Sequence, residues 1–352
     1  MEFFDRDQIQ QRLLDWYANH GRKHLPWKQP LTPYRVWVAE VMLQQTQVAT
    51  VLPYYERFIQ RFASVEDLAA AALDDVLQLW AGLGYYSRAR NLHRTAQIII
   101  SDHGGQFPDE LTLLRKLPGI GEYTAGAIVS FAFQRQASIV DGNVKRVISR
   151  LHALPDWPGQ SQTHRLIWDI ATHYTPKQQC HLYNQAIMDL GSLVCTPNQP
   201  DCSQCPWQIF CIAHQRQQTD CFPVKKPTVA KPTQERYFLL LKNPQQQILL
   251  EKRPPTGIWG GLWSLPECSL TQNISHWCKQ YYGLSIHQQS PLPTFKHSFS
   301  HYHLMIHPIA LDVSQTINVI RDGGQTCWYD QAQAITQGIP KPVKYLLEQY
   351  QS

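Results

Sequence analysis

The sequence predicts a multi-domain protein in which a mainly α-helical domain is followed by a smaller α+β domain. Its 352 residues exceed the usual size of a single domain. Apolar residues recur with helical spacing in the first part of the chain and form short runs of strand character after residue 235. Residues 223–235, PVKKPTVAKPTQE, are rich in Pro, Lys and Thr, as in a semi-rigid linker. We therefore expect a helical domain over residues 1–222 and an α+β domain over residues 236–352.

The composition is that of a folded protein outside the membrane. Hydrophobic residues make up 43% of the chain, and no apolar run is long enough to cross a bilayer. The opening sequence, MEFFDRDQIQ, lacks the basic region and the apolar segment of a secretion signal. We expect a cytoplasmic monomer without a targeting signal. The net charge of +5 is too small to indicate nucleic-acid binding by itself.

Helix signals near the start of the chain indicate packing rather than chemistry. Apolar residues recur with helical period over residues 5–20, and Gly21 follows in the place of a helix end. Ser64 and Asp67 have the spacing of a capping box, which predicts the start of another helix.

One carboxylate, Glu40, lies in an otherwise apolar helical segment, YRVWVAEVML. A glutamate among apolar neighbours such as Trp37 and Val41 costs free energy when charged, so its pKa should rise. Such a residue can hold a proton near neutral pH and act as an acid. Taken alone, it is equally well interpreted as a buried glutamate paired with an arginine such as Arg35.

A Leu-Pro-Gly-Ile-Gly turn, residues 117–121, separates two helical patterns. Pro118 ends the first helix, and Gly119 and Gly121 permit backbone angles that other residues avoid. Such a turn can present bare N–H groups at a helix start to a phosphate. An ordinary helix–helix connection is the other interpretation.

Asp141 follows an apolar run and precedes a helix that carries Lys145 and Arg146. As a helix cap, its carboxylate should stay ionised near neutral pH. Glycoside hydrolysis requires a proton on the leaving group and negative charge near the sugar. Two carboxylates whose pKa values are pushed apart, here Glu40 and Asp141, can fill these two roles.

Four of the nine cysteines form one group with the spacing C-x6-C-x2-C-x5-C: Cys195, Cys202, Cys205 and Cys211. Four thiolates so spaced can reach one centre, and the spacing suits either a [4Fe-4S] cluster or structural zinc. A disulfide framework is not expected in a chain of this kind.

The hairpin followed by VDGNVKR resembles the helix-hairpin-helix DNA glycosylase superfamily, and VAEVMLQQTQV resembles adenine DNA glycosylases of the MutY type. The resemblance implies that Glu40 protonates adenine at N7, that Asp141 is its carboxylate partner, and that Asn143 orients Asp141 or water. It also implies groups that enter or distort the duplex: Gln45, Thr46, Leu83 and Tyr85. Cofactors implied are a [4Fe-4S] cluster on the four cysteines and a monovalent cation at the hairpin.

Basic residues near the hairpin and the cysteines are less easily assigned. Three arginines, Arg88, Arg90 and Arg94, can reach phosphates or form a solvated helix face. Between the first two cysteines the sequence TPNQPD carries only an acidic charge, so a phosphate contact by that loop is in doubt.

Tyr123 stands where hairpins of strand-cutting relatives carry a Schiff-base lysine. An enzyme without that amine removes the base with water and leaves an abasic site. Tyr123 either hydrogen bonds near Asp141 or only packs.

The second domain should contain paired strands around Asn243, further strands in HYHLMIHPIALDV and QTCWYD, and helices near 270–282 and 341–350. GGLWSLPE resembles the opening of a Nudix domain, but the charged helix that holds its magnesium is replaced by ISHWCKQYYGL. We expect a Nudix-like fold without nucleotide hydrolysis. Phe299, Ser300 and His301 match the loop that inspects 8-oxoguanine in the resembled family, although F-S-H alone usually marks a strand end.

The resemblance covers nearly the whole chain. It implies a monofunctional base-excision-repair glycosylase that removes adenine mispaired with 8-oxoguanine or guanine from double-stranded DNA. Two alternatives are a bifunctional pyrimidine glycosylase and lyase of the endonuclease III type, and a non-catalytic DNA-damage-binding iron–sulfur protein. Tyr123, Glu40 and the second domain argue against the first, and the paired Glu40 and Asp141 argue against the second.

Overall fold

The computed structural model describes residues 3–226, 230–313, 325–330 and 338–350. The chain forms two compact units, Met1–Ala70 with Asn91–Thr228, and Ala71–Arg90 with Val229–Ser352. Each unit has its own hydrophobic core. No helix in the described ranges combines the length and the apolarity that a membrane crossing needs.

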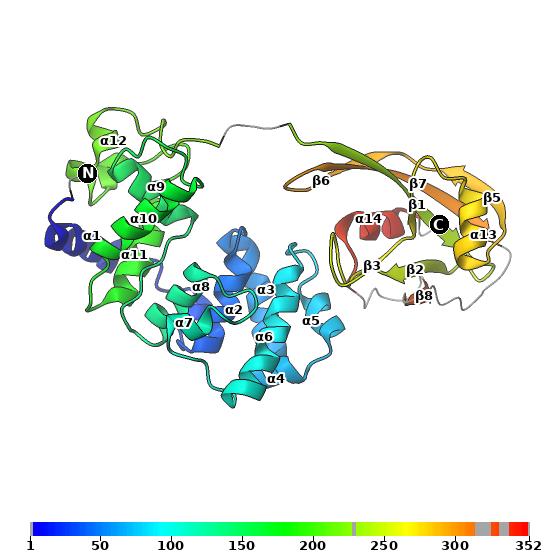
Figure 1. The fold of residues 1–352 in the computed structure, drawn as a ribbon, viewed down its shortest axis with the longest axis horizontal. Helices are drawn as coiled ribbons and strands as arrows, with labels where there is room; N and C mark the ends of the chain where they lie inside the picture. Colours follow the sequence, from blue (N-terminus) through cyan, green and yellow to red (C-terminus); the bar gives the residue numbers. More distant parts are fainter. Residues whose placement is uncertain (1–2, 227–229, 314–324, 331–337, 351–352) are drawn as a thin grey trace. The chain divides into compact units, whose positions relative to one another are not determined.

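The first unit is helical, as predicted (Figure 1). Its main helices are α1 (Arg6–His20), α2 (Pro33–Leu43), α3 (Val48–Arg61), α4 (Val65–Ala70), α7 (Leu111–Leu114), α8 (Glu122–Ala127), α9 (Gly142–Leu151), α10 (Ser161–Tyr174), α11 (Cys180–Leu193) and α12 (Ile212–Gln215). Helix α5 (Leu73–Leu79) belongs to the second unit, and α6 (Ser87–His103) begins there and continues into the first.

The local start signals read from the sequence are present. Asp5 caps α1 by accepting the Gln8 N–H at 2.9 Å. Ser64 and Asp67 form the reciprocal bonds of a capping box, at 3.1 and 3.2 Å. These side chains satisfy backbone donors that the first turn of a helix leaves open.

The core of the first unit lies among α1, α9, α10 and α11, with buried side chains such as Leu13, Val147 and Leu190. Each such side chain contributes about 1.5–3 kcal/mol through burial. Gly191 lets α11 approach α9 closely, because a Cβ there would lie 2.6 Å from the Cβ of Asn143. Packing therefore fixes the start of α9 against α11.

The predicted hairpin joins α7 to α8. Gly119 has φ +77° and its added Cβ would lie 2.8 Å from Asn91 Cβ, so glycine is required by both backbone and space. Gly121 is the N-cap of α8. Helix α7 has only 4 residues, shorter than the sequence pattern indicated. The pattern after the hairpin divides into α8 and a π-helical turn, Ile128–Ala132, a distortion often found at functional sites.

The second unit contains one mixed sheet in the order β3-β2-β1-β7-β5, with β4 on β1, β6 on β7 and β8 on β2. The strands are β1 (Thr233–Lys242), β2 (Ile248–Lys252), β3 (Trp263–Ser264), β4 (Glu267–Cys268), β5 (Ile286–Pro291), β6 (Phe295–Ser298), β7 (His303–Val313) and β8 (Thr326–Tyr329). The parallel pair β1 and β7 is central, and the predicted antiparallel pair β1 and β2 is present.

One helix covers each face of this sheet (Figure 1). Helix α13 (Ile274–Tyr282) packs on one face through Trp277 and Cys278. Helix α14 (Lys341–Gln349) packs on the other through Val343 and Leu346. The α+β character expected for this part of the chain is confirmed.

Candidate active site

A single cavity of about 1220 Å³ lies within the first unit. Its walls bring together seven of the residues singled out from the sequence: Glu40, Gln45, Thr46, Gly121, Tyr123, Asp141 and Asn143. They come from α2, the turn after it, and the starts of α8 and α9. The volume exceeds the usual range for small-molecule sites, about 300–1,000 Å³, so a nucleotide can fit.

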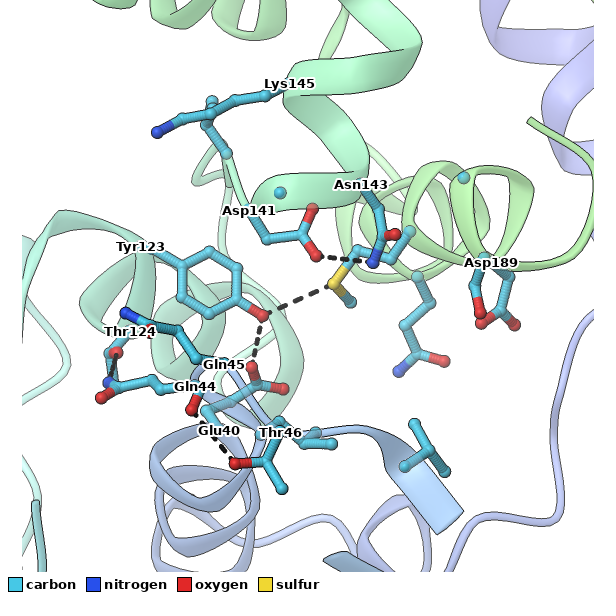
Figure 2. Close-up of a pocket in the computed structure, with 18 of the residues that line it drawn as sticks. Glu40, Gln44, Gln45, Thr46, Tyr123, Thr124, Asp141, Asn143, Lys145 and Asp189 are labelled. Carbon is cyan, nitrogen blue, oxygen red and sulfur yellow. Dashed lines mark hydrogen bonds between the residues drawn. The ribbon is translucent and has the colours of Figure 1, made fainter. Parts of the chain in front are cut away.

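Glu40 is 4% exposed and accepts a hydrogen bond from the hydroxyl of Tyr123 (Figure 2). The pKa of Glu40 is raised to about 7, mainly by burial and also by the charge of Asp141, while the Tyr123 hydrogen bond and Lys28 act to lower it. The predicted rise is therefore found. The side-chain hydrogen-bond partner of Glu40 is Tyr123 rather than Arg35. Tyr123 therefore does more than pack, and its hydroxyl binds Glu40 rather than Asp141.

Asp141 caps α9, as the sequence predicted. One carboxylate oxygen accepts the Val144 N–H at 2.7 Å, and the other accepts Asn143 Nδ2 at 2.9 Å. Burial nevertheless raises the pKa of Asp141 above its ordinary value, with these hydrogen bonds and Arg146 acting to lower it. A cap at the surface would lower the pKa of Asp141. Here the pKa rises instead, because the cap lies inside the cavity wall, where burial outweighs the cap hydrogen bonds.

Asn143 is held from its other side by Arg146. The guanidinium donates to Asn143 Oδ1 at 2.8 Å, to the Gly191 carbonyl at 2.7 Å and to the Cys195 carbonyl at 2.7 Å. A continuous set of hydrogen bonds thus connects Asp141 to the start of the cysteine loop. The orientation of one carboxylate of the site depends on that loop being in place.

Sequence reasoning missed the polar groups that α11 and the preceding loop bring to the cavity. Asp189, buried on α11, binds Arg22 through its backbone and guanidinium at 2.6–2.8 Å. Lys28 lies 3.9 Å from Asp189, and burial lowers its pKa. An aspartate inside the apolar run IMDLG was the available signal, since a buried charge must be paired.

Met188 was a further wall residue that sequence reasoning missed, and Lys145 was named there only as part of the helix after Asp141. Met188 Sδ lies 3.5 Å from the Tyr123 hydroxyl. Lys145 lines the cavity near Asp141, and burial lowers its pKa (Figure 2). An amine is therefore present in space, although the hairpin sequence around Tyr123 contains none.

Leu83 and Tyr85 do not line this cavity and belong to the second unit. Tyr85 is 49% exposed with φ +50°, whereas Leu83 is buried. Arg88 is also buried, and its guanidinium donates to the carbonyls of Leu83 and Gly84 at 3.3 and 3.1 Å. Arg88 thus supports the turn at Leu83 and Gly84. It neither points toward a phosphate nor lies on a solvated helix face, the two positions expected from the sequence.

The four cysteines line one small cavity of about 20 Å³: Cys195, Cys202, Cys205 and Cys211. Buried Arg150 holds this loop, donating to Cys195 Sγ at 3.4 Å and to the carbonyls of Thr196 and Pro197 at 2.6 and 2.9 Å. Within the described ranges, no three Cys, His, Asp or Glu side chains are arranged to hold a metal ion. The donor set is nevertheless four thiols around a common space.

In the second unit, Phe299, Ser300 and His301 lie in the turn between β6 and β7. Phe299 is stacked on Tyr302, with ring centroids 4.8 Å apart. The Nudix-type carboxylate Glu267 forms an ion pair with Arg253. That pairing leaves Glu267 with a fixed positive partner instead of a free oxygen donor.

Comparisons with known proteins agree with this geometry. Residues 38–173 match the HhH-GPD superfamily of base excision DNA repair proteins, and residues 237–349 match the NUDIX domain. A solved thermostable thymine-DNA glycosylase is 26% identical, covers 60% of this chain and 97% of its own, and superposes with a TM-score of 0.55. A solved endonuclease III in a non-covalent DNA complex covers 61% of this chain and 99% of its own, with a TM-score of 0.52. At 24% identity this is a similarity of fold alone.

The fold and the site define a helix-hairpin-helix DNA glycosylase, a hydrolase acting on N-glycosyl bonds. The adenine DNA glycosylase of Buchnera aphidicola subsp. Baizongia pistaciae is 38% identical over 340 residues, 96% of this chain and 95% of that protein. The adenine DNA glycosylase of Homo sapiens is 33% identical over 96% of this chain and 73% of its own. This chain belongs to the adenine DNA glycosylase family, which confirms the resemblance and the predicted fold class.

Protonation of Glu40 should be visible as a pH dependence of stability. The pKa is about 7 in the folded protein against 4.5 ordinarily, so the folded state binds this proton more tightly. The stabilisation is complete below the ordinary pKa and is lost as pH rises through 7. The unfolding free energy of the wild type relative to Glu40→Gln should fall by about 2–3 kcal/mol between about pH 5 and about pH 8.

Urea unfolding followed by circular dichroism measures this difference. Glu56→Gln, an exposed glutamate on α3, serves as the matched control and should retain the wild-type dependence. An unchanged difference between wild type and Glu40→Gln across this range would contradict the raised pKa.

Proposed function

We propose that this protein hydrolyses the N-glycosidic bond of adenine that is mispaired with 8-oxoguanine or guanine in double-stranded DNA. The observation that carries the proposal is the pair of carboxyl groups, Glu40 and Asp141, in one nucleotide-sized cavity. Their surroundings differ: Glu40 is bound by a tyrosine hydroxyl, whereas Asp141 is bound by a backbone N–H and an amide. Groups with such different partners can take the separate roles of acid and anion.

In the proposed reaction, Glu40 donates its proton to N7 of the extruded adenine. With a pKa of about 7, the carboxyl is substantially protonated at neutral pH and still acidic enough to release its proton. The Tyr123 hydroxyl stabilises the carboxylate that remains. The C1′–N9 bond then breaks, and its electron pair leaves with the adenine.

Asp141 stabilises the positive charge that develops on the sugar, and water adds at C1′ to give an abasic site. Its two oxygens each already accept a hydrogen bond from α9, so the carboxylate is fixed before the substrate arrives. Asn143 orients Asp141, and Arg146 in turn orients Asn143. Fixed charge of this kind costs little reorganisation during the reaction.

DNA is engaged by groups outside the reacting centre. Gln45 and Thr46 are at the cavity edge, directly after α2, and Gln45 is exposed in a left-handed backbone conformation. They enter the duplex beside the extruded base together with Tyr85 and Leu83, the latter after moving out of its buried position. Backbone amides at Gly119 and Gly121 bind phosphate, and the monovalent cation at this hairpin stays a prediction.

The proposed division of labour places base removal in residues 1–222 and lesion recognition in residues 236–352, joined by the linker 223–235. Phe299, Ser300 and His301 read 8-oxoguanine opposite the adenine. Their place in a tight turn between two strands supports this, because the turn presents Ser300 and His301 as exposed side chains. We propose that the protein acts as a monomer.

The four cysteines would hold a [4Fe-4S] cluster, which would cross-link the loop of residues 195–211. Four thiols facing a common space fit a cluster, which carries its ligands at the corners of a cage. A single zinc ion would instead draw all four ligands to within about 2.3 Å of one point.

Replacing Glu40 by Gln should abolish adenine release while leaving DNA binding intact. We expect the single-turnover rate on a duplex with adenine opposite 8-oxoguanine to fall by about 10²–10⁴-fold, the usual contribution of general acid catalysis. Glu56→Gln should retain the wild-type rate. Abasic sites are revealed by alkali added after the reaction.

The same assay tests which mispair is the substrate and whether the enzyme is a monofunctional glycosylase or a lyase. Wild type should act on adenine opposite 8-oxoguanine and guanine and spare adenine opposite thymine. Strand cleavage without alkali would instead indicate a lyase, with Lys145 as the amine in the cavity.

Tyr123→Phe should move the pH dependence of the reaction. The acid must be protonated, so the rate falls as pH rises through the pKa of Glu40. Because the Tyr123 hydrogen bond lowers that pKa, its removal should shift the falling limb to higher pH. Single-turnover rates across pH measure the shift, and Tyr55→Phe, a buried tyrosine outside the cavity, should leave the limb in place. A limb that moves to lower pH would contradict the proposed role.

Metal analysis distinguishes a [4Fe-4S] cluster from a zinc ion on the four cysteines. Anaerobically purified protein should contain about four iron and four sulfide per chain, and Cys202→Ser should lower this content. Cys221→Ser removes an exposed cysteine outside the group and should not. One zinc per chain and no iron would overturn the cluster assignment.

A further inference from the structure

The hairpin formed by β6 and β7 carries a polar face whose role the proposed reaction does not explain. Its turn, residues 299–302, is closed by a hydrogen bond from the Phe299 N–H to the Tyr302 carbonyl at 2.9 Å. Strand β7 also pairs in parallel with β1 along its length. The hairpin and the start of β1 therefore form one three-stranded ribbon.

The strand register places a set of polar side chains on one face of this ribbon, since residues directly paired across strands point to the same side. The register pairs Ser298 with His303 and Lys296 with Met305 on the β6 side, and His303 with Thr233 and Met305 with Glu235 on the β1 side. The intervening residues, such as Leu304 and Ile306, point into the core under α14.

Farther along the strands, the same face is covered by α13 and is apolar, as at Ile309 and Leu311. Among the described residues no helix covers it near the turn: β6 and the adjoining ends of β1 and β7 extend beyond α13 (Figure 1). Lys296 and Ser298 are exposed there, and His303 is half-buried. The fold thus leaves one end of this face open to a partner.

Positive charge is concentrated on this open end. Lys231 Nζ donates to the Phe299 carbonyl at 2.9 Å, which brings the ammonium group to the turn itself. Desolvation lowers the pKa of His303, and the charges of Lys296 and Lys231 lower it further, so both ammonium groups lie near this imidazole. Ser298 Oγ lies 2.9 Å from His303 Nδ1.

One carboxylate on this face, that of Glu235, is engaged by a histidine rather than by the two lysines. Glu235 lies in the row of Met305 and Lys296, with Met305 between the two charged residues. Its Oε2 lies 2.9 Å from His307 Nε2, on the side of the face away from the turn. The row nearest the turn, made of Ser298, His303 and Thr233, contains no carboxylate, and in the next row Met305 separates Lys296 from Glu235.

We propose that Lys231, Lys296, His303 and Ser298 form a phosphate-binding cluster that docks on the backbone of the strand whose base is inspected by the turn at residues 299–301. This inference rests on the proposed function and adds to it a second kind of contact. Ammonium groups and a hydroxyl are typical partners of phosphodiester oxygens.

The cluster would set the position from which the turn reads the base. Phosphate contacts fix register and orientation, whereas base contacts supply specificity. Because Lys231 binds both the turn carbonyl and, in the complex, a phosphate, the backbone contact and the reading turn are mechanically connected.

The test uses the full-length protein and measures duplex affinity against salt concentration. Lys231→Gln and Lys296→Gln should each reduce the slope of log affinity against log salt by about 1, and the double variant by about 2. For Lys296→Gln, affinity should fall by the same factor for adenine opposite 8-oxoguanine and opposite guanine, since a phosphate contact carries no base information. Lys231→Gln also removes the bond to the turn, so it should weaken binding of the duplex with 8-oxoguanine more than binding of the duplex with guanine.

Three controls make the result decisive. Lys279→Gln changes an exposed lysine on α13 and should leave the slope unchanged. Lys296→Arg should restore the slope, because the charge is kept. Thermal unfolding checks that each Gln variant is folded, and if Lys231→Gln is not, Lys296→Gln alone carries the test, with an expected change in slope of about 1.

An unchanged salt slope in the double variant would overturn the cluster, as would a loss confined to the duplex with 8-oxoguanine, which would make these residues base readers. The proposed function fails separately, on wild-type excision. If wild type released no adenine, the slopes would still report whether the cluster binds DNA.

Discussion

The burial of Glu40 is the constraint on which the rest of the catalytic unit depends. A carboxyl group that is to hold a proton at neutral pH must be removed from water, and only a packed shell of other elements can do this. Helix α2 supplies the apolar neighbours, α8 supplies Tyr123, and α11 supplies Met188. The helices around the cavity therefore serve the acid as much as they serve stability.

This arrangement opposes stability in one respect. As pH rises toward neutrality, the folded protein must either keep the Glu40 proton or bury a charge, and both cost free energy relative to the unfolded chain. The Tyr123 hydrogen bond and the nearby Lys28 limit that cost by stabilising the charged form. They also prevent the pKa from rising so far that the group could no longer release its proton. The same two contacts thus set both the energetic cost and the working range of the acid.

The parts predicted from the sequence were those encoded by local patterns. Capping residues, the Gly119 turn, the cap at Asp141 and the change from helical to strand spacing are properties of neighbouring residues, so they could be read without a fold. The sequence did not reveal that Arg88 supports a turn, that Asp189 binds Arg22, or that Arg146 connects Asn143 to the cysteine loop. These contacts join positions far apart in the chain or depend on burial, and no local pattern specifies them.

The length of α7 and the direction of the pKa shift of Asp141 both depend on the tertiary environment. A helical pattern predicts where a helix can form, but the Pro118 turn and packing decide where it ends. The cap hydrogen bonds lower the pKa of Asp141, as the local rule says, but burial in the cavity wall outweighs them and raises the pKa above its ordinary value. In both cases the tertiary environment overrode a correct local rule.

Under the proposed function, two units are needed because the chemistry of base removal cannot by itself distinguish a mispaired adenine from a paired one. Adenine presents the same N7 and the same glycosidic bond whether its partner is thymine, guanine or 8-oxoguanine, so a cavity that fits adenine cannot distinguish a mispair from a normal pair. Discrimination must come from the opposite base, read by a separate group. The second unit offers a Nudix-type sheet, in which Glu267 is paired with Arg253, and a tight turn between β6 and β7. Under the proposed function, the pKa of the acid and the reading of the lesion can therefore change independently, because no residue contributes to both.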